Sequence, residues 1–250
     1  MSELERVRLT RTRHLWQRTR GHRTGTDDIL CAWAAKSSVP DARRALELGA
    51  GQGAVSLMVT EAMPEIHVTA IEAQVVSYEL LERNVRENGV GSRYELHCGD
   101  LRRAPFEAGV FDLVFGTPPF MPMGSGTLPQ DAQRAAARFE MRGGVEAYCE
   151  AANRALRPGG GFALVMDAAR PERYEAALEN AGLSLERVTE VLPLEGRPPT
   201  YLVYAARKGV MIDTERATLT VRDDHERFSA DFRDVRLSLN LPSERERWIE

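Results

Sequence analysis

The residues of this chain that could hold a ligand begin at a glycine-rich turn. The stretch Leu46-Glu47-Leu48-Gly49-Ala50-Gly51-Gln52-Gly53 joins an expected buried strand over 44–48 to an expected helix over about 53–62. Glycines let the backbone turn sharply and let a ligand approach bare amides, while a helix N-terminus favours polar or anionic groups. A tight turn without a ligand has the same composition, so the acidic residues that follow decide between the two interpretations.

Two acidic residues stand where the next two expected strands end. Glu72 closes the strand over 67–72, and Asp100 follows the strand near 94–98. A carboxylate at the end of the second strand can accept hydrogen bonds from both ribose hydroxyls of a nucleoside cofactor. Asp100 is placed to accept from an adenine amine. Singly, such acids are more often helix caps or surface charges, but together with the glycine turn they predict a cofactor site.

A proline-rich segment follows the fourth expected strand. The strand over 111–116 runs into Thr117-Pro118-Pro119-Phe120. Two prolines hold the backbone rigid with carbonyls pointing outward, and the aromatic ring can stack on a flat substrate. An ordinary proline-rich turn has the same composition, and it is the preceding motifs that favour a substrate site.

The elements that must position these residues follow an alternating order. Expected strands lie near 44–49, 67–72, 94–98, 112–116 and 161–166, and expected helices near 53–62, 74–88, 143–156 and 171–182. This order predicts a parallel sheet covered by helices on both faces. The strands near 186–192 and 200–206 are joined by a loop too short for a crossover helix, so we expect an antiparallel pair at the sheet edge.

The same patterns divide the chain into three parts. We expect a basic, largely helical segment over 1–40, a main α/β domain over 41–208 that holds these motifs, and a strand near 217–221 with a polar tail over 209–250. The first segment is rich in arginine: Arg6, Arg8, Arg11, Arg13, Arg18, Arg20 and Arg23. On a chain of net charge −4, this arm could follow a phosphate backbone or form a solvated helix face, and both interpretations stay open.

Bulk composition bounds the remaining possibilities. At 250 residues and 43% hydrophobic content, the chain can hold one large domain with small additions. No run of about eighteen apolar residues exists, and residues 1–23 lack the apolar core of a signal peptide, so we expect a cytoplasmic protein without a membrane span. The cysteines Cys31, Cys98 and Cys149 are widely spaced, and no histidine pair has metal-ligand spacing. We therefore expect free thiols and no metal.

Taken in order, these motifs resemble those of class I S-adenosylmethionine-dependent methyltransferases. The match is to the branch with an Asn/Asp-Pro-Pro-Tyr/Phe motif, which methylates exocyclic or amide nitrogens. Within it, the chain is most similar to the tRNA(Val) adenine-37 N6-methyltransferase family with its small methyltransferase domain. Further matching stretches are Gly21-His22-Arg23 with Asp27 and Leu30, Arg134 with Ala137-Arg138-Phe139-Glu140, and Leu219-Thr220-Val221 with Phe228-Ser229 and Phe232. The resemblance covers nearly the whole chain.

This resemblance implies a doubly wound, Rossmann-like α/β fold with a seven-stranded, mostly parallel sheet and an antiparallel edge hairpin. It implies S-adenosylmethionine as cofactor and S-adenosylhomocysteine as product. The implied cofactor ligands are Arg23, Thr26, Glu47, Gly49, Gly51, Gly53, Glu72, Asp100 and Leu101. The implied catalytic residues are Thr117, Pro118 and Phe120, and the implied substrate contacts are Phe120, Arg138 and Glu140. An Arg138–Glu140 ion pair that only holds the loop is the alternative role for those two.

One residue departs from the family motif. Thr117 stands where Asn or Asp is usual, and in the family that side chain and the next proline carbonyl accept hydrogen bonds from the target NH2. A threonine hydroxyl can still accept a hydrogen bond, although it reaches less far. Three hypotheses therefore stay open: methylation of an adenine N6 in structured RNA such as tRNA, methylation of a protein amide or a small molecule, and a non-catalytic cofactor-binding module.

Overall fold

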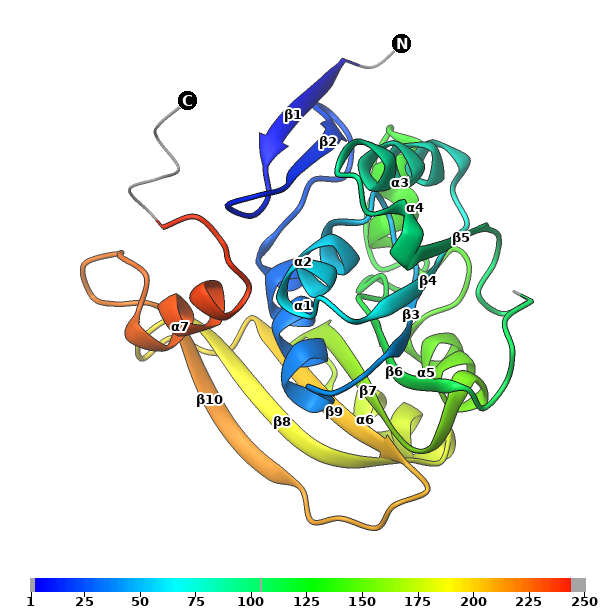
Figure 1. The fold of residues 1–250 in the computed structure, drawn as a ribbon. Coiled ribbons are helices and arrows are strands. Elements are labelled where there is room, and N and C mark those ends of the chain that lie inside the picture. Colours follow the sequence, from blue (N-terminus) through cyan, green and yellow to red (C-terminus); the bar gives the residue numbers. More distant parts are fainter. Residues whose placement is uncertain (1–2, 104, 244–250) are drawn as a thin grey trace.

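An eight-stranded sheet with helices on both faces forms the body of the computed structural model, which describes residues 3–103 and 105–243 (Figure 1). The strand order is β10-β8-β9-β7-β6-β3-β4-β5. The strands are β3 (Arg44–Leu48), β4 (His67–Glu72), β5 (Tyr94–Cys98), β6 (Phe111–Gly116), β7 (Leu156–Asp167), β8 (Leu183–Leu194), β9 (Tyr201–Lys208) and β10 (Glu215–Arg222). Strands β3 to β7 pair in parallel, and β9 runs antiparallel to β7 and β8.

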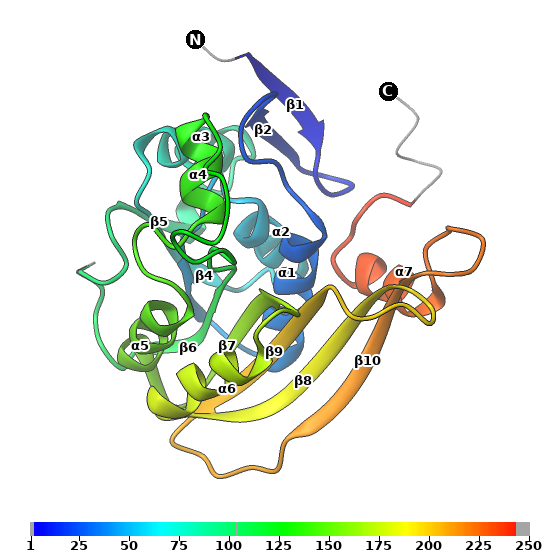
Figure 2. The ribbon, with the colours of Figure 1, turned by 180° about the vertical axis from the view of Figure 1, so that it is seen from behind.

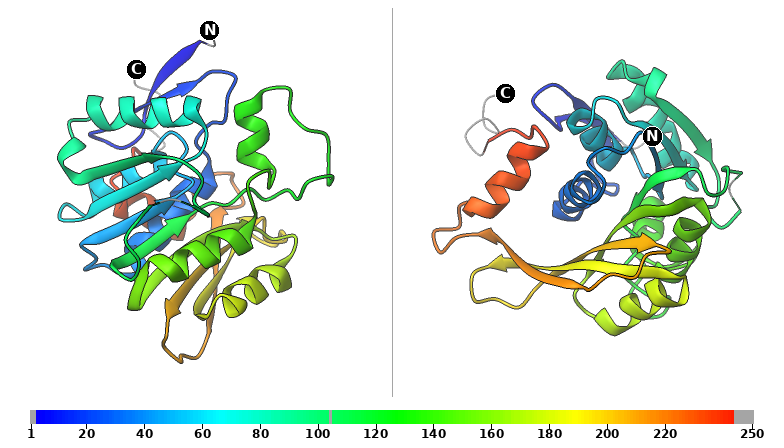
Figure 3. Two further views of the ribbon diagram at one scale, coloured as in Figure 1. Left: turned by 90° about the vertical axis from the view of Figure 1, so that its right-hand side faces the viewer. Right: turned by 60° about the horizontal axis from the view of Figure 1, so that its bottom comes forward.

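The helices form a layer on each face of this sheet. They are α1 (Thr26–Ser38), α2 (Ala54–Ala62), α3 (Val75–Glu87), α4 (Ala132–Arg138), α5 (Val145–Ala155), α6 (Pro171–Asn180) and α7 (Ala230–Ser238), with a 3-10 turn at Gly91–Arg93. Helices α1, α2, α3 and α7 pack in one apolar cluster, while α5 and α6 pack in the other (Figure 3, right). The strands and helices expected between residues 44 and 208 are confirmed, and so is the Rossmann-like class.

The far edge of the sheet differs from the expectation. The hairpin of β8 and β9 is antiparallel as predicted, but β10 pairs in parallel with β8 and takes the outer position, so the sheet has eight strands and not seven. Alternate residues of β10, Leu219 and Val221, are buried and pack in the same apolar cluster as Phe232 and Val235 of α7. Burial of this one face places the C-terminal strand in the sheet.

The N-terminal segment also differs from the expectation, because its first part is a β-hairpin and not a helix. Strand β1 (Leu4–Arg8) pairs antiparallel with β2 (His14–Arg18), and helical structure starts only at α1. Leu15 and Gln17 alternate with half-buried neighbours along β2, and this period of two fits a strand.

Two asparagines of α3 hydrogen-bond the free edge of β2. The Asn84 side chain accepts from the Trp16 amide at 2.7 Å and donates to the Trp16 carbonyl at 3.0 Å. Asn88, one turn further, bonds the His14 amide and carbonyl in the same way at 3.1 and 2.8 Å. Asn84 Nδ2 also donates to the carbonyl of Gln52 at 2.9 Å, inside the glycine-rich turn. The Asn84 side chain therefore links the hairpin to the glycine-rich turn.

Several arginines of the N-terminal arm serve the fold. Arg13 is buried and pairs with Glu61 of α2 at 3.0 Å, Arg18 pairs with Asp131 before α4 at 2.8 Å, and Arg23 pairs with Glu5 at 2.8 Å. The arm is thus an integral part of the domain, and its deletion would expose the carboxylates and amides that it covers.

Replacing Asn84 with alanine should lower the free energy of unfolding by about 2 kcal/mol, because the amide and carbonyls that it bonds lose their partner in a fully buried place. Urea unfolding measures this change. The control is Glu79→Ala on the exposed side of α3, which should leave the midpoint unchanged. Equal midpoints for the two variants would contradict the role given to Asn84.

Candidate functional site

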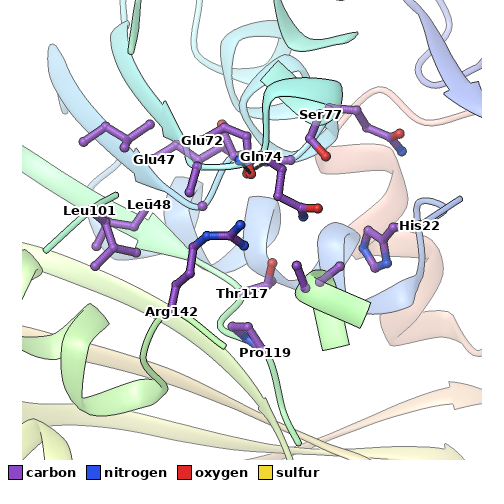
Figure 4. A pocket seen from close by; sticks show the side chains of 18 of the residues that line it. His22, Glu47, Leu48, Glu72, Gln74, Ser77, Leu101, Thr117, Pro119 and Arg142 are labelled. Atoms are coloured by element: carbon purple, nitrogen blue, oxygen red, sulfur yellow. Dashed lines mark hydrogen bonds between the residues drawn. The ribbon is translucent and has the colours of Figure 1, made fainter. Parts of the chain in front are cut away.

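An open pocket lies where β3, β4, β5 and β6 end at their carboxyl side. The chain order changes direction here, since β3 is flanked by β4 on one side and by β6 on the other, and ligands of open α/β sheets bind at such points. Figure 4 shows the side chains of Glu47, Glu72, Thr117 and Arg142 around this pocket. The structure therefore brings together the motifs that follow four different strands.

The glycine-rich turn forms one wall of the pocket. Gly49, Gly51 and Gly53 have φ of +66°, +57° and +86°, in the left-handed region where side chains cause strain. A Cβ on Gly49 would lie 2.1 Å from the Tyr148 hydroxyl, whereas a Cβ on Gly51 would meet nothing within 4 Å. Gly49 is thus required by close packing, and Gly51 leaves open space beside its amide.

Glu72 fixes the geometry of this turn. Its two oxygens accept hydrogen bonds from the Gly51 amide at 2.8 Å and from the Gln74 amide at 2.7 Å. Burial raises the pKa of Glu72, and these amide bonds oppose that shift. Each carboxylate oxygen has a second lone pair, so Glu72 can also accept hydrogen bonds from ribose hydroxyls.

Glu47 is a buried acid with an unused oxygen beside the pocket. It is 2% exposed, and among the described residues its Oε2 has no hydrogen-bond partner. Burial raises the pKa of Glu47 to about 8, hydrogen bonds with Ser56 oppose this, and the charge of Glu72 adds to it. A cationic ligand group here would satisfy Oε2 and bring the pKa down again, so this carboxyl group suits the amino group of a methionine moiety.

Asp100 lines the pocket with its charge intact. Hydrogen bonds from Arg102, with Nε 2.9 Å from Oδ1, lower the pKa of Asp100 against the opposing effect of burial. Leu101 is buried and lines the pocket beside it. These residues, the glycine turn, Glu47 and Glu72 together fit a nucleoside cofactor that carries a positive charge.

The proline-rich segment provides a second wall. Thr117 and Pro119 line the pocket, and Pro118 is buried beside them. Phe120 lies outside the pocket lining and packs against Tyr201 at the start of β9, with ring centroids 6.0 Å apart. Tyr201 was missed by the sequence analysis because only the pairing of β9 with β7 brings it to this edge.

Three of the expected cofactor ligands, Arg23, Thr26 and Gly53, lie outside the pocket lining. The Arg23 side chain is 56% exposed and pairs with Glu5, and Thr26 is the first residue of α1. His22 and Asp28 from the same segment line the pocket in their place. The pKa of His22 is lowered, mainly by burial. The charge of Asp27 opposes this shift, and the charges of Arg134 and Arg138 add to it.

Asp28 has a local role as well. Its Oδ2 accepts a hydrogen bond from the Gly25 amide at 2.9 Å, which helps to cap the N-terminus of α1. Burial raises the pKa of Asp28 well above its ordinary value.

The sequence analysis missed other lining residues too: Gln74, Ser77, Gln133 and Arg142. Nothing in their spacing distinguishes them from surface residues.

The two expected substrate contacts have different surroundings. Arg138 is exposed at the end of α4, and Glu140 is bound by Arg173 of α6 at 2.8 Å, not by Arg138. Arg173 also pairs with Glu146 at 2.7 Å. The alternative Arg138–Glu140 ion pair is therefore wrong, and the segment after α4 is held by Arg173.

Neither a metal site nor a membrane span is found in the part of the chain that the structure describes. No cluster of three or more His, Cys, Asp or Glu side chains there could hold a metal ion. No helix there has the length and apolar content that crossing a bilayer requires.

Comparisons with known proteins agree with this geometry. The model of the methyltransferase small domain family matches residues 29–191. The tRNA1(Val) (adenine(37)-N6)-methyltransferase of Tolumonas auensis is 30% identical over 222 residues, which cover 88% of this chain and 90% of that protein. The protein of the same name from Porphyromonas gingivalis strain W83 is 30% identical over 72% of each chain.

Solved structures show the same fold. The crystal structure of a predicted O-methyltransferase from Agrobacterium tumefaciens matches with a TM-score of 0.67 and 21% identity, over 85% of this chain and 98% of that one. A geranyl diphosphate methyltransferase matches with a TM-score of 0.53 and 14% identity, over 71% and 77%. At such identities the likeness shows the Rossmann-like methyltransferase fold alone.

The buried acid Glu47 should make stability depend on pH. Since its pKa is near 4.5 when unfolded and about 8 when folded, its cost to folding is absent below pH 4.5 and grows until about pH 8. The ligand-free Glu47→Gln variant lacks this cost. Relative to wild type, it should gain on the order of 3 kcal/mol of stability between pH 5 and pH 8, measured by urea unfolding. Parallel pH profiles would disprove the assignment.

Proposed function

This chain belongs to the methyltransferase small domain family and is an S-adenosylmethionine-dependent methyltransferase, and we propose that its acceptor is the N6 amino group of an adenine in structured RNA such as a tRNA. Membership of this methyltransferase family argues against the hypothesis of a non-catalytic cofactor-binding module. The observation that carries the proposal is that Thr117 and Pro119 line the same pocket as Gly51 and Glu72. A group bound at the proline-rich segment would thus lie beside the cofactor.

The cofactor supplies a methyl group on a positively charged sulfur, which an amine nitrogen can take up. In the proposed complex, Glu72 would accept hydrogen bonds from the ribose hydroxyls and Asp100 from the adenine amine. Glu47, whose Oε2 has no partner among the described residues, would hold the methionine amino group. The turn from Gly49 to Gly53 gives the cofactor access to bare backbone, where side chains would collide or block it.

The acceptor amine is a poor nucleophile, so its placement supplies most of the catalysis. Thr117 Oγ1 and the Pro118 carbonyl accept hydrogen bonds from the NH2 group, which directs the nitrogen lone pair towards the methyl group. Phe120, supported by Tyr201, stacks on the base. A base must leave its stack to enter such a pocket, which favours a nucleotide in an RNA loop.

The relatives support RNA as the acceptor in preference to a protein amide or a small molecule. Two proteins that are 30% identical, one of them over 90% of its length, carry names that specify adenine 37 of tRNA1(Val). The proposal takes from them the chemical class, an exocyclic adenine amine in folded RNA.

Methyl transfer to RNA tests the proposal directly. With labelled S-adenosylmethionine and unmodified tRNA transcripts, label should enter RNA and, after nuclease digestion, elute as N6-methyladenosine. Glu72→Ala should weaken cofactor binding at least roughly tenfold in calorimetry and reduce transfer accordingly, because it removes the acceptor for the ribose. Label in another nucleoside, or only in added protein, would refute adenine N6 as the target.

The hydroxyl of Thr117 should matter for turnover and not for cofactor binding. Thr117→Val keeps the shape and removes the acceptor, so kcat should fall roughly 10- to 100-fold while the Kd of S-adenosylmethionine stays the same. Thr117→Ser, which keeps the hydroxyl, is the matched control and should retain most of the activity. If Val and Ser variants turn over equally fast, the hydroxyl has no part in positioning the amine.

A further inference from the structure

Helix α4 borders the pocket and presents two arginines beside it. Gln133, Ala136 and Ala137 line the pocket, whereas Arg134 and Arg138 are exposed, four residues apart on one face of the helix. Figures 1 and 2 both show α4 next to α3 and close to the β1–β2 hairpin. One face of α4 therefore lines the pocket, and another face lies on the outer surface of the molecule.

The turn after the hairpin carries a third exposed arginine. Arg20 lies two residues beyond the end of β2. Arg18, two residues before it, binds Asp131 and Gln133 at the start of α4 at 2.8 and 3.1 Å, and the His22 amide donates to Gln133 Oε1 at 3.3 Å. These contacts fix the segment that carries Arg20 against α4. We name Arg20, Arg134 and Arg138 the arginine rim.

Within the described residues, the three rim side chains differ from the thirteen arginines that pair with carboxylates. Among residues 3–103 and 105–243, no ion pair is found for any of the three rim side chains, while Arg13, Arg18 and Arg173 all have one. Asp131, the acid nearest to Arg134 in the sequence, is bound by Arg18. Like charges four residues apart disfavour a helix, while Arg138 in the last turn is favoured by the helix dipole, so the two arginines bring α4 little net stability.

The rim is close enough to the pocket to act on it. The positive charges of Arg134 and Arg138 act on His22, which lines the pocket. Asp28, Glu47, Glu72 and Asp100 line the pocket together with Arg142. The rim offers three guanidinium groups outside this lining, so it can hold a phosphate backbone there while one nucleotide enters.

We propose that Arg20, Arg134 and Arg138 form a phosphate-binding surface that holds the RNA backbone next to the nucleotide to be methylated. This inference rests on the proposed RNA acceptor. Guanidinium groups suit the task because they are always charged and bind phosphate oxygens in pairs. Arg13, Arg18 and Arg23 of the N-terminal arm form ion pairs within the protein. Of the arm's arginines, the proposal therefore assigns an RNA contact to Arg20 alone.

The test compares two double variants that remove equal charge. Arg134→Gln with Arg138→Gln removes two rim charges. Arg43→Gln with Arg44→Gln removes two exposed charges at the amino end of β3, at the opposite end of the strands from the pocket. Binding of unmodified tRNA transcripts is measured at several salt concentrations, together with KM for tRNA, kcat and the Kd of S-adenosylmethionine.

The rim variant should bind tRNA more weakly, and its slope of log K against log salt should be less steep by about 1.4 to 1.8, for two lost phosphate contacts. Its KM for tRNA should rise, while kcat and the cofactor Kd stay within about twofold of wild type. The control variant should keep the wild-type slope. Arg20→Gln, as an independent single variant, should reduce the slope by about 0.7 to 0.9.

The outcomes separate the two proposals. Unchanged tRNA affinity and salt slope in the rim variants of an enzyme that methylates tRNA would overturn the rim and leave the proposed function standing. Equal losses in the rim and control variants would also overturn it, since net charge alone would then explain the effect. A wild-type enzyme that binds cofactor but neither binds nor methylates RNA would overturn the proposed function and the rim with it.

Discussion

The contact on which the site depends is the buried carboxylate of Glu72 between two backbone amides. Its oxygens bind the amides of Gly51 and Gln74, so the end of β4 determines the shape of the turn that follows β3. A buried charge without donors would be costly, and these bonds satisfy it while leaving lone pairs for a ligand. The same carboxylate thus stabilises the apo turn and forms part of the cofactor site.

The N-terminal hairpin extends this constraint outward. Asn84 bonds Trp16 on one side and Gln52 on the other, so the hairpin, α3 and the glycine-rich turn form one hydrogen-bonded unit. The Gln52 side chain adds contacts to Gln17 and Thr24 at 3.4 and 3.3 Å. An RNA surface carried by this hairpin would be rigidly placed relative to the cofactor, which a flexible arm would not achieve.

Charge is arranged in layers around the pocket. Acids line its interior, where burial raises the pKa of Glu47, Asp28 and Glu72, and a cationic ligand would lower it again. Exposed arginines without a carboxylate partner among the described residues lie beside the pocket on α4 and after β2. In the proposed function, the interior attracts a positively charged cofactor and the rim attracts a polyanionic substrate. The two ligands therefore bind at different parts of the site.

The sequence by itself determined the strands and helices from β3 to β9 apart from α4, and the positions of the motifs at the strand ends. Both depend on local spacing: apolar periodicity, glycines that require positive φ, and an acidic residue at the end of each of two successive strands. Only the tertiary structure decided the hairpin β1–β2, the outer strand β10, the Glu140–Arg173 ion pair and the places of Tyr201 and Arg142 in or beside the pocket. These depend on partners far away in the chain, such as Asn84 for β2 and β8 for β10, and local residue preferences do not encode which distant surface a segment will pair with.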